Sequence, residues 1–192
     1  LTHLLCAPQF KFTLMPDEYV VLVDEQDQEI GQMEKMEAHR LGLLHRAFSI
    51  LLFNSKGELL LQQRAAHKYH SPLLWTNTCC SHQRPGETTL LAAERRLREE
   101  MGMSAPMQTA FSFLYKANLD QGLSEHELDH VVFGYTNQDP IINPEEVQAF
   151  QWITIEQLSQ QLKNNPQTLT VWFQILLEQH LEKITKAANE SM

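Results

Sequence analysis

The chain has 192 residues, enough for one hydrophobic core of ordinary size and few for two domains. Its 43% apolar and 20% charged residues exclude a disordered protein, and no apolar run approaches the roughly 18 residues that a membrane span needs. The 24 acidic and 15 basic residues give a net charge of −9, which argues against a nucleic-acid partner, because such partners require a basic surface. Three Cys without a disulfide framework, and no secretory signal over residues 1–15, predict a cytoplasmic protein.

The N-terminal part of the chain predicts strands after an irregular start. Residues 1–16 end at Pro16, and we expect them to form a peripheral extension before a single domain over 17–188. Runs of β-branched and apolar residues, joined by polar turns, predict strands over residues 19–23, 29–33, 47–53 and 59–62.

The rest of the chain predicts helices separated by further strands. The segment 88–101 has its apolar residues at helical spacing, and Gly102 is placed to end that helix. Thr154 and Gln157 form a capping box that begins a short helix, and a last helix is expected over 170–187. Strands are expected over 111–116, 131–135 and 149–153. This order predicts an α+β fold with a mixed β-sheet packed between helices.

The helix over 88–101 also carries charged residues at a specific spacing. Its sequence from Glu87 is Glu87-x7-Arg95-Arg96-Leu97-x-Glu99-Glu100-x-Gly102-Met103. This resembles the Nudix signature G-x5-E-x7-R-E-U-x-E-E-x-G-U, in which U is apolar, with Ser81 at the first Gly and Arg96 at the Glu after Arg. Carboxylates on a helix can hold Mg²⁺ bound to a diphosphate. Arg96 weakens a hydrolytic site with several metal ions and supplies a cation for the diphosphate. Without the full spacing, the pattern would fit an ordinary surface helix.

A second group of motifs lies outside this helix. In chain order these motifs are Ala38-His39, His45-Arg-Ala-Phe48, Trp75-Thr-Asn-Thr-Cys-Cys-Ser-His82 and Glu125-His-Glu127. Together with the altered helix motif they resemble the type I isopentenyl-diphosphate isomerases, a family with the Nudix fold. The resemblance extends over about residues 18–185, nearly the whole chain.

The resemblance implies two cation sites. The Zn²⁺ or Mn²⁺ site of the family, made of three His and two Glu, corresponds to His39, His45, His82, Glu125 and Glu127. Mixed imidazole and carboxylate ligands suit either ion, and the sequence does not choose between them. The residue that holds Mg²⁺ together with the substrate diphosphate corresponds to Glu100.

The resemblance also implies the reacting residues and the substrate, a small diphosphate. The catalytic residues correspond to Cys80, Tyr115, Glu127 and Trp172, and the diphosphate-binding cations to Lys35, Arg64, Lys68 and Arg96. Moving the double bond of isopentenyl diphosphate reversibly requires an acid, a base, an electron-rich wall and exclusion of water. Cys80 and Glu127 are expected to handle the protons in either order, and Trp172 to face the cation. We expect a monomer or weak homodimer with neither a nucleic-acid nor a membrane partner.

Three alternatives to an isomerase remain open. The first is a Nudix hydrolase acting on a nucleotide-like diphosphate, and Arg96 is the residue against it. The second is a metal-binding module without catalysis. The residues 126–130 also match His-Glu-x-x-His, which binds zinc in proteases only on a helix, whereas the β-branched run that follows predicts a strand.

Several other histidines carry weaker expectations. The spacing of His39 and His45 predicts that a loop brings them together. We expect His67 and His70 in a surface loop, and surface or structural roles for His3, His130 and His180.

Overall fold

The computed structural model describes residues 18–119 and 122–191, so the predicted extension over 1–16 lies outside the described residues. Within these ranges one sheet has nine strands. The strands are β1 (Tyr19–Val23), β2 (Glu29–Glu34), β3 (His45–Phe53), β4 (Glu58–Arg64), β5 (Trp75–Thr76), β6 (Cys79–Ser81), β7 (Met107–Asn118), β8 (Ser124–Tyr135) and β9 (Val147–Thr154). The helices are α1 (Lys35–Leu41), α2 (Thr89–Met101), α3 (Ile155–Asn164) and α4 (Val171–Glu190), with a 3-10 turn η2 (Pro166–Thr168) before α4.

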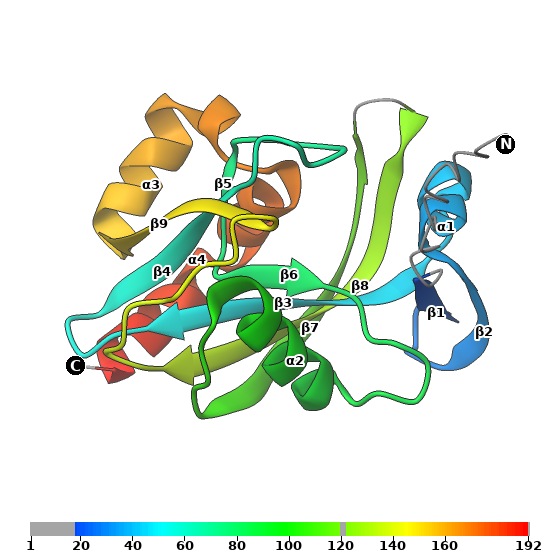
Figure 1. The fold of residues 1–192 in the computed structure, drawn as a ribbon, viewed down its shortest axis with the longest axis horizontal. Coiled ribbons are helices and arrows are strands. Elements are labelled where there is room, and N and C mark those ends of the chain that lie inside the picture. Colours follow the sequence, from blue (N-terminus) through cyan, green and yellow to red (C-terminus); the bar gives the residue numbers. More distant parts are fainter. Residues whose placement is uncertain (1–17, 120–121, 192) are drawn as a thin grey trace, which may run out of the picture.

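Strand β3 crosses the middle of the sheet (Figure 1). One of its edges pairs in parallel with β8 from His45 to Phe53, and its other edge pairs antiparallel with β6. Strand β8 also pairs antiparallel with β7, and β4 pairs antiparallel with β5 and β9. The parallel pair among antiparallel ones makes the sheet mixed, as predicted.

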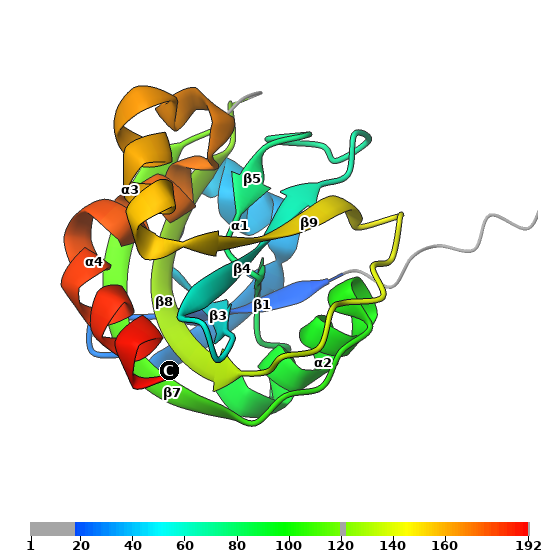
Figure 2. The same cartoon turned by 90° about the vertical axis from the view of Figure 1, so that its left-hand side faces the viewer.

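Helices cover both faces of this sheet, with α2 on one side and the pair α3 and α4 on the other (Figure 2). Because strand side chains alternate between the faces, β3 contributes to both cores. Phe48, Ile50 and Leu52 pack with the apolar residues of α2, whereas Leu51 and Phe53 pack in the core that includes α4. The α+β fold predicted from the order of elements is confirmed.

The predicted helix boundaries agree with the structure. The side chain of Thr88 accepts a hydrogen bond from the backbone of Leu91, and Gly102 ends α2 with a positive φ of 61°. Thr154 and Gln157 form the expected capping box at α3. Helix α1 has seven residues and was not predicted, because its N-cap is Glu34 rather than a Ser, Thr, Asp or Asn. No helix in 18–119 or 122–191 is sufficiently long and apolar to cross a membrane.

Gly134 provides a test of the packing around β8. A Cβ atom there would lie 2.6 Å from Cδ2 of Leu52 and 2.8 Å from the carbonyl oxygen of Pro106. We therefore expect Gly134→Ala to lower the free energy of unfolding by about 1–3 kcal/mol, measured by urea denaturation.

The matched control is Gly31→Ala in β2, where the nearest atom to a new Cβ is 3.9 Å away. This variant is expected to stay within about 0.5 kcal/mol of the unaltered protein. Equal stability of the two variants would contradict the packing described here.

Candidate active site

Strand pairing places the site residues next to one another. Glu127 of β8 lies beside His45 of β3 on one side and beside Tyr115 of β7 on the other. On the opposite edge of β3, Cys80 of β6 pairs with Ser49, and His82 follows this strand directly. Residues distant in the sequence therefore line a single pocket.

Four potential metal ligands converge beside this pocket, and three of them, His39, His82 and Glu127, line it. One ligand atom from each of His39, His45, His82 and Glu127 lies within 4.8 Å of the other three. Oε1 of Glu127 is 2.9 Å from Nε2 of His82 and 3.5 Å from Nε2 of His45. Burial lowers the pKa of His82 well below its usual value, which favours the neutral, ligating form of the imidazole.

Glu125 lies at the edge of this group. Its Oε2 is buried and makes no hydrogen bond, although it is 3.2 Å from Nε2 of His39. An unsatisfied buried carboxylate oxygen beside the imidazole of His39, at the edge of the group of three His and Glu127, fits a site for a divalent ion, because imidazole nitrogens and carboxylate oxygens are donor atoms that Zn²⁺ and Mn²⁺ accept.

Backbone carbonyls orient two of the imidazoles toward this centre. Nδ1 of His39 lies 2.7 Å from the carbonyl oxygen of Lys35, and Nδ1 of His45 lies 2.8 Å from that of Leu43. These contacts leave both Nε2 atoms for a ligand, as in other metal sites. His39 belongs to α1 and His45 begins β3, and the expected loop between these elements, residues 42–44, brings the two histidines together. A short turn at Gly42, with φ of 61°, connects the two elements.

The reacting residues predicted from the resemblance line the same pocket. The hydroxyl of Tyr115 donates to Oε2 of Glu127 at 2.6 Å, and the indole N–H of Trp172 donates to Oγ1 of Thr76 at 3.0 Å. Burial opposes ionisation of Glu127, but hydrogen bonds from His45 and Tyr115 outweigh it and lower its pKa to about 2. Burial raises the pKa of the Cys80 thiol, which keeps it protonated at neutral pH.

The other end of the pocket contains the predicted diphosphate-binding cations. Lys35, Arg64, Lys68, Arg96 and the predicted Mg²⁺ ligand Glu100 all line it. Nη2 of Arg96 lies 2.5 Å from Oε1 of Glu100, and the amide of Gln62 donates to the other oxygen of Glu100 at 2.8 Å. The guanidinium of Arg64 lies 5.2 Å from the ring centre of Trp172. All the residues predicted for the site except His45 thus line one pocket, and His45 lies beside it in the group with His39, His82 and Glu127.

Several residues of this pocket are not predicted by the sequence. His70 was expected in a surface loop, but it is 6% exposed and its ring packs edge-on against Trp172 at 5.5 Å. Gln62 and Glu146 also line the pocket. No spacing in the sequence marks these residues, because contacts between elements far apart in the chain determine their positions.

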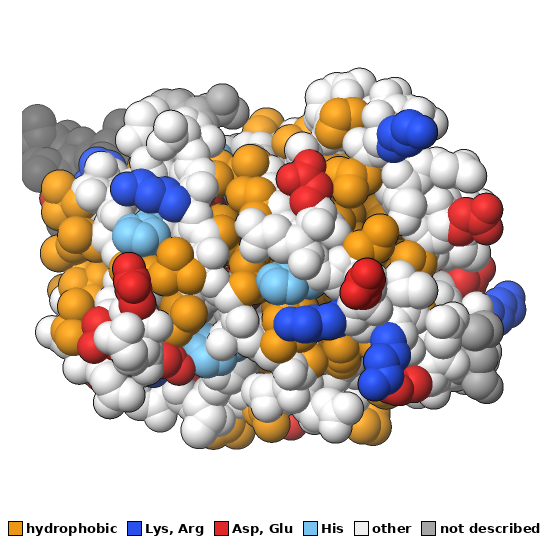
Figure 3. All heavy atoms as spheres, turned by 180° about the vertical axis from the view of Figure 1, so that it is seen from behind, with side chains coloured by type: hydrophobic (Ala, Val, Ile, Leu, Met, Phe, Trp, Pro, Cys, Tyr) orange, Lys and Arg blue, Asp and Glu red, His pale blue; other side chains and the backbone are white. Residues whose placement is uncertain are grey.

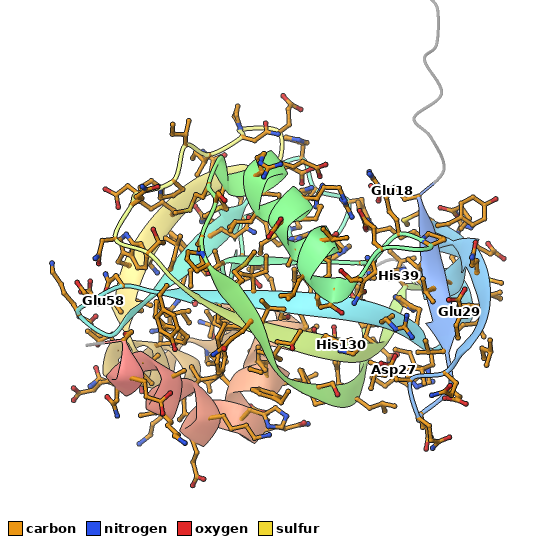
Figure 4. All side chains as sticks on the ribbon, turned by 90° about the horizontal axis from the view of Figure 1, so that it is seen from below. Glu18, Asp27, Glu29, His39, Glu58 and His130 are labelled. Carbon is orange, nitrogen blue, oxygen red and sulfur yellow. The ribbon has the colours of Figure 1, made fainter. Side chains whose placement is uncertain are left out.

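The His-Glu-x-x-His motif lies on β8 and not on a helix, so it cannot form a protease site. Glu125 and Glu127 face the pocket, whereas His126 and His130 face away from it. Nδ1 of His126 lies 2.9 Å from the carbonyl oxygen of Gly42. His130 lies beside Asp27, at the turn between β1 and β2, with 3.3 Å between Nε2 and Oδ2 (Figure 4).

Comparison with known proteins shows the class of this fold. A model of the NUDIX domain matches residues 43–173. The crystal structure of DR0079 from Deinococcus radiodurans superposes with a TM-score of 0.71 at 23% identity, covering 84% of this chain and 98% of that one. A MutT protein from Methanosarcina mazei Go1 has a TM-score of 0.59 at 20% identity, covering 73% of this chain and 94% of that one. The protein is therefore a Nudix-fold protein.

Relatives with similar sequences identify the family within this class. The isopentenyl-diphosphate Delta-isomerase of Pectobacterium atrosepticum is 53% identical over 161 residues, covering 84% of this chain and 90% of the relative. The enzyme of the same name from Serratia proteamaculans is 51% identical with the same coverage, and that of Aliivibrio fischeri strain MJ11 is 46% identical over 178 residues. The chain belongs to the isopentenyl-diphosphate Delta-isomerase family.

The group of His39, His45, His82 and Glu127 can be tested by metal binding. Because His82 offers its Nε2 to this group, His82→Ala is expected to weaken Zn²⁺ or Mn²⁺ binding by at least about 10-fold. The measurement is titration of the chelator-treated protein with each ion. His130→Ala removes a histidine on the opposite face of β8 and is expected to bind the ion normally. Equal loss in both variants would show that the four residues are not the metal site.

Proposed function

We propose that the protein interconverts isopentenyl diphosphate and dimethylallyl diphosphate. The observation that carries this proposal is the placement of Cys80 and Glu127 in one pocket, from strands that pair with opposite edges of β3. A substrate between them would have one proton-handling group on each side, as transfer of a double bond requires. The names of the relatives support the same reaction.

In the proposed reaction, one group of the pair adds a proton to the terminal carbon of the alkene, and a tertiary cation forms. The other group removes a proton from the carbon on the far side of the cation, so the double bond moves by one position. Cys80 holds a proton and Glu127 is ionised, so the pocket contains both an acid and a base. Trp172 offers an aromatic face that stabilises the cation, and its burial helps to exclude water.

The metal ions belong to the same proposal. His39, His45, His82, Glu125 and Glu127 would hold Zn²⁺ or Mn²⁺, and Glu100 would hold Mg²⁺ with the diphosphate. Such ions orient carboxylates and neutralise phosphate charge. Tyr115 keeps its own role without an ion, because its hydrogen bond orients Oε2 of Glu127.

Two features support a small diphosphate substrate over the alternatives. Arg96 stands where the Nudix signature has a further Glu, and it contacts both Glu99 and Glu100. It therefore reduces the negative charge that is available to bind hydrolytic metal ions. On the face shown in Figure 3, basic and acidic side chains lie interspersed rather than forming a basic stripe. The cytoplasmic location and the monomeric or weakly dimeric state are part of this proposal.

The roles of Cys80 and Glu127 can be tested by substitution. Cys80→Ala and Glu127→Gln are each expected to reduce isomerisation by at least about 100-fold, because each removes a proton-transfer group. The assay follows deuterium uptake from heavy water into dimethylallyl diphosphate, after chelation and then with Mg²⁺ and either Zn²⁺ or Mn²⁺ restored.

The control is Cys79→Ala, because Cys79 is buried in the core on the α2 side and does not line the pocket. It is expected to retain turnover, and circular dichroism should show that all three variants fold. Full activity of Cys80→Ala or Glu127→Gln would contradict the assigned roles. Phosphate release without the allylic product would favour the hydrolase instead.

A further inference from the structure

Three of the four cations at the diphosphate end already contact carboxylates. Nζ of Lys35 lies 2.9 Å from Oε2 of Glu18, and Arg96 contacts Glu99 and Glu100. Lys68 forms an ion pair with Glu146. A diphosphate entering this pocket therefore meets cations whose charge is largely balanced, and it must compete with the carboxylates for them.

Among these carboxylates, Glu146 is placed to compete most directly with a diphosphate for the cations. Its Oε2 contacts Nζ of Lys68 and lies 3.5 Å from Nη2 of Arg96, so one oxygen joins two of the predicted diphosphate ligands. These cations come from different elements, the loop after β4 and helix α2. The oxygen thus lies where an anion bound by both cations would place one of its own oxygens.

The backbone holds Glu146 in this position. Its carbonyl oxygen accepts a hydrogen bond from the backbone of Ala65 at 3.0 Å, and its N–H donates to Asn143 at 2.9 Å. The side chain is 23% exposed and that of Lys68 is 20% exposed, so water screens the ion pair only in part. Burial raises the pKa of Glu146, but Lys68 and Arg96 outweigh this effect and lower it, so the carboxylate is ionised at neutral pH.

We propose that Glu146 is an internal counter-ion that competes with the substrate diphosphate for Lys68 and Arg96. This inference rests on the proposed function for the identity of the anion. A divalent cation in the pocket would offset the carboxylate charge, so Glu146 makes diphosphate binding depend more strongly on that cation. This dependence favours a diphosphate that carries a divalent cation over other anions, because anions without such a cation bind weakly.

The variant Glu146→Gln separates charge from shape. The amide oxygen of Gln can still accept a hydrogen bond from Lys68, whereas the negative charge is removed. We expect this variant to bind inorganic diphosphate about 10-fold more tightly than the unaltered protein in the presence of a chelator, measured by calorimetry. Addition of Mg²⁺ should narrow the difference.

Two further variants make the test specific. Glu145→Gln removes a carboxylate from the same loop, but its side chain is 83% exposed and approaches only the exposed His67 among the described ion pairs. It is expected to bind diphosphate within about 2-fold of the unaltered protein. Glu146→Asp keeps the charge and should also bind weakly without a divalent cation. Binding by Glu146→Gln that is unchanged or weaker, or an equal gain in Glu145→Gln, would overturn the proposal.

The same protein preparation is assayed for isomerisation of isopentenyl diphosphate. If the unaltered protein shows no turnover while Glu146→Gln gains affinity, the proposed function fails and the counter-ion role stands. If turnover is normal and Glu146→Gln gains no affinity, the counter-ion role fails and the proposed function stands.

Discussion

The parallel pairing of β3 with β8 is the constraint on which the rest of the structure depends. Alternate residues of β3 enter two different cores, so a shift of one position would turn apolar side chains to the wrong face. The same register places His45 beside Glu127. Packing of the core and assembly of the site therefore depend on one set of backbone hydrogen bonds. A shift in the register of β3 against β8 would disrupt both.

Local charge pairing explains how an acidic chain can receive an anion. Several charged groups of the pocket have partners, as the unfavourable transfer of charge from water requires. At one end imidazoles surround Glu127, and at the other end carboxylates balance Lys35, Lys68 and Arg96. The net charge of −9 describes the whole chain and says little about the potential inside this pocket.

Local signals made part of this structure predictable. The apolar spacing and the cap residues of α2 lie within one segment, and the β-branched run after Glu127 favours a strand over a helix at the His-Glu-x-x-His motif. Strand β8 is longer than predicted, because its polar residues Glu125, Glu127 and Asp129 face inward and break the apolar alternation. The burial of His70 depends on α4, which follows it by about 100 positions, and no pattern near His70 encodes that contact.

The origin of the site in distant segments has a consequence for folding. The hydrogen bond from Ser49 of β3 to Asp129 of β8 joins two residues that are 80 positions apart in the sequence, so it closes a long loop. Loops of this length close late, after local hairpins and helices have formed. The histidines come from α1, β3 and the segment after β6, so they meet Glu127 only when β8 has docked. An ion held by these four residues would tie the two halves of the chain together, and its binding would mark the completion of folding.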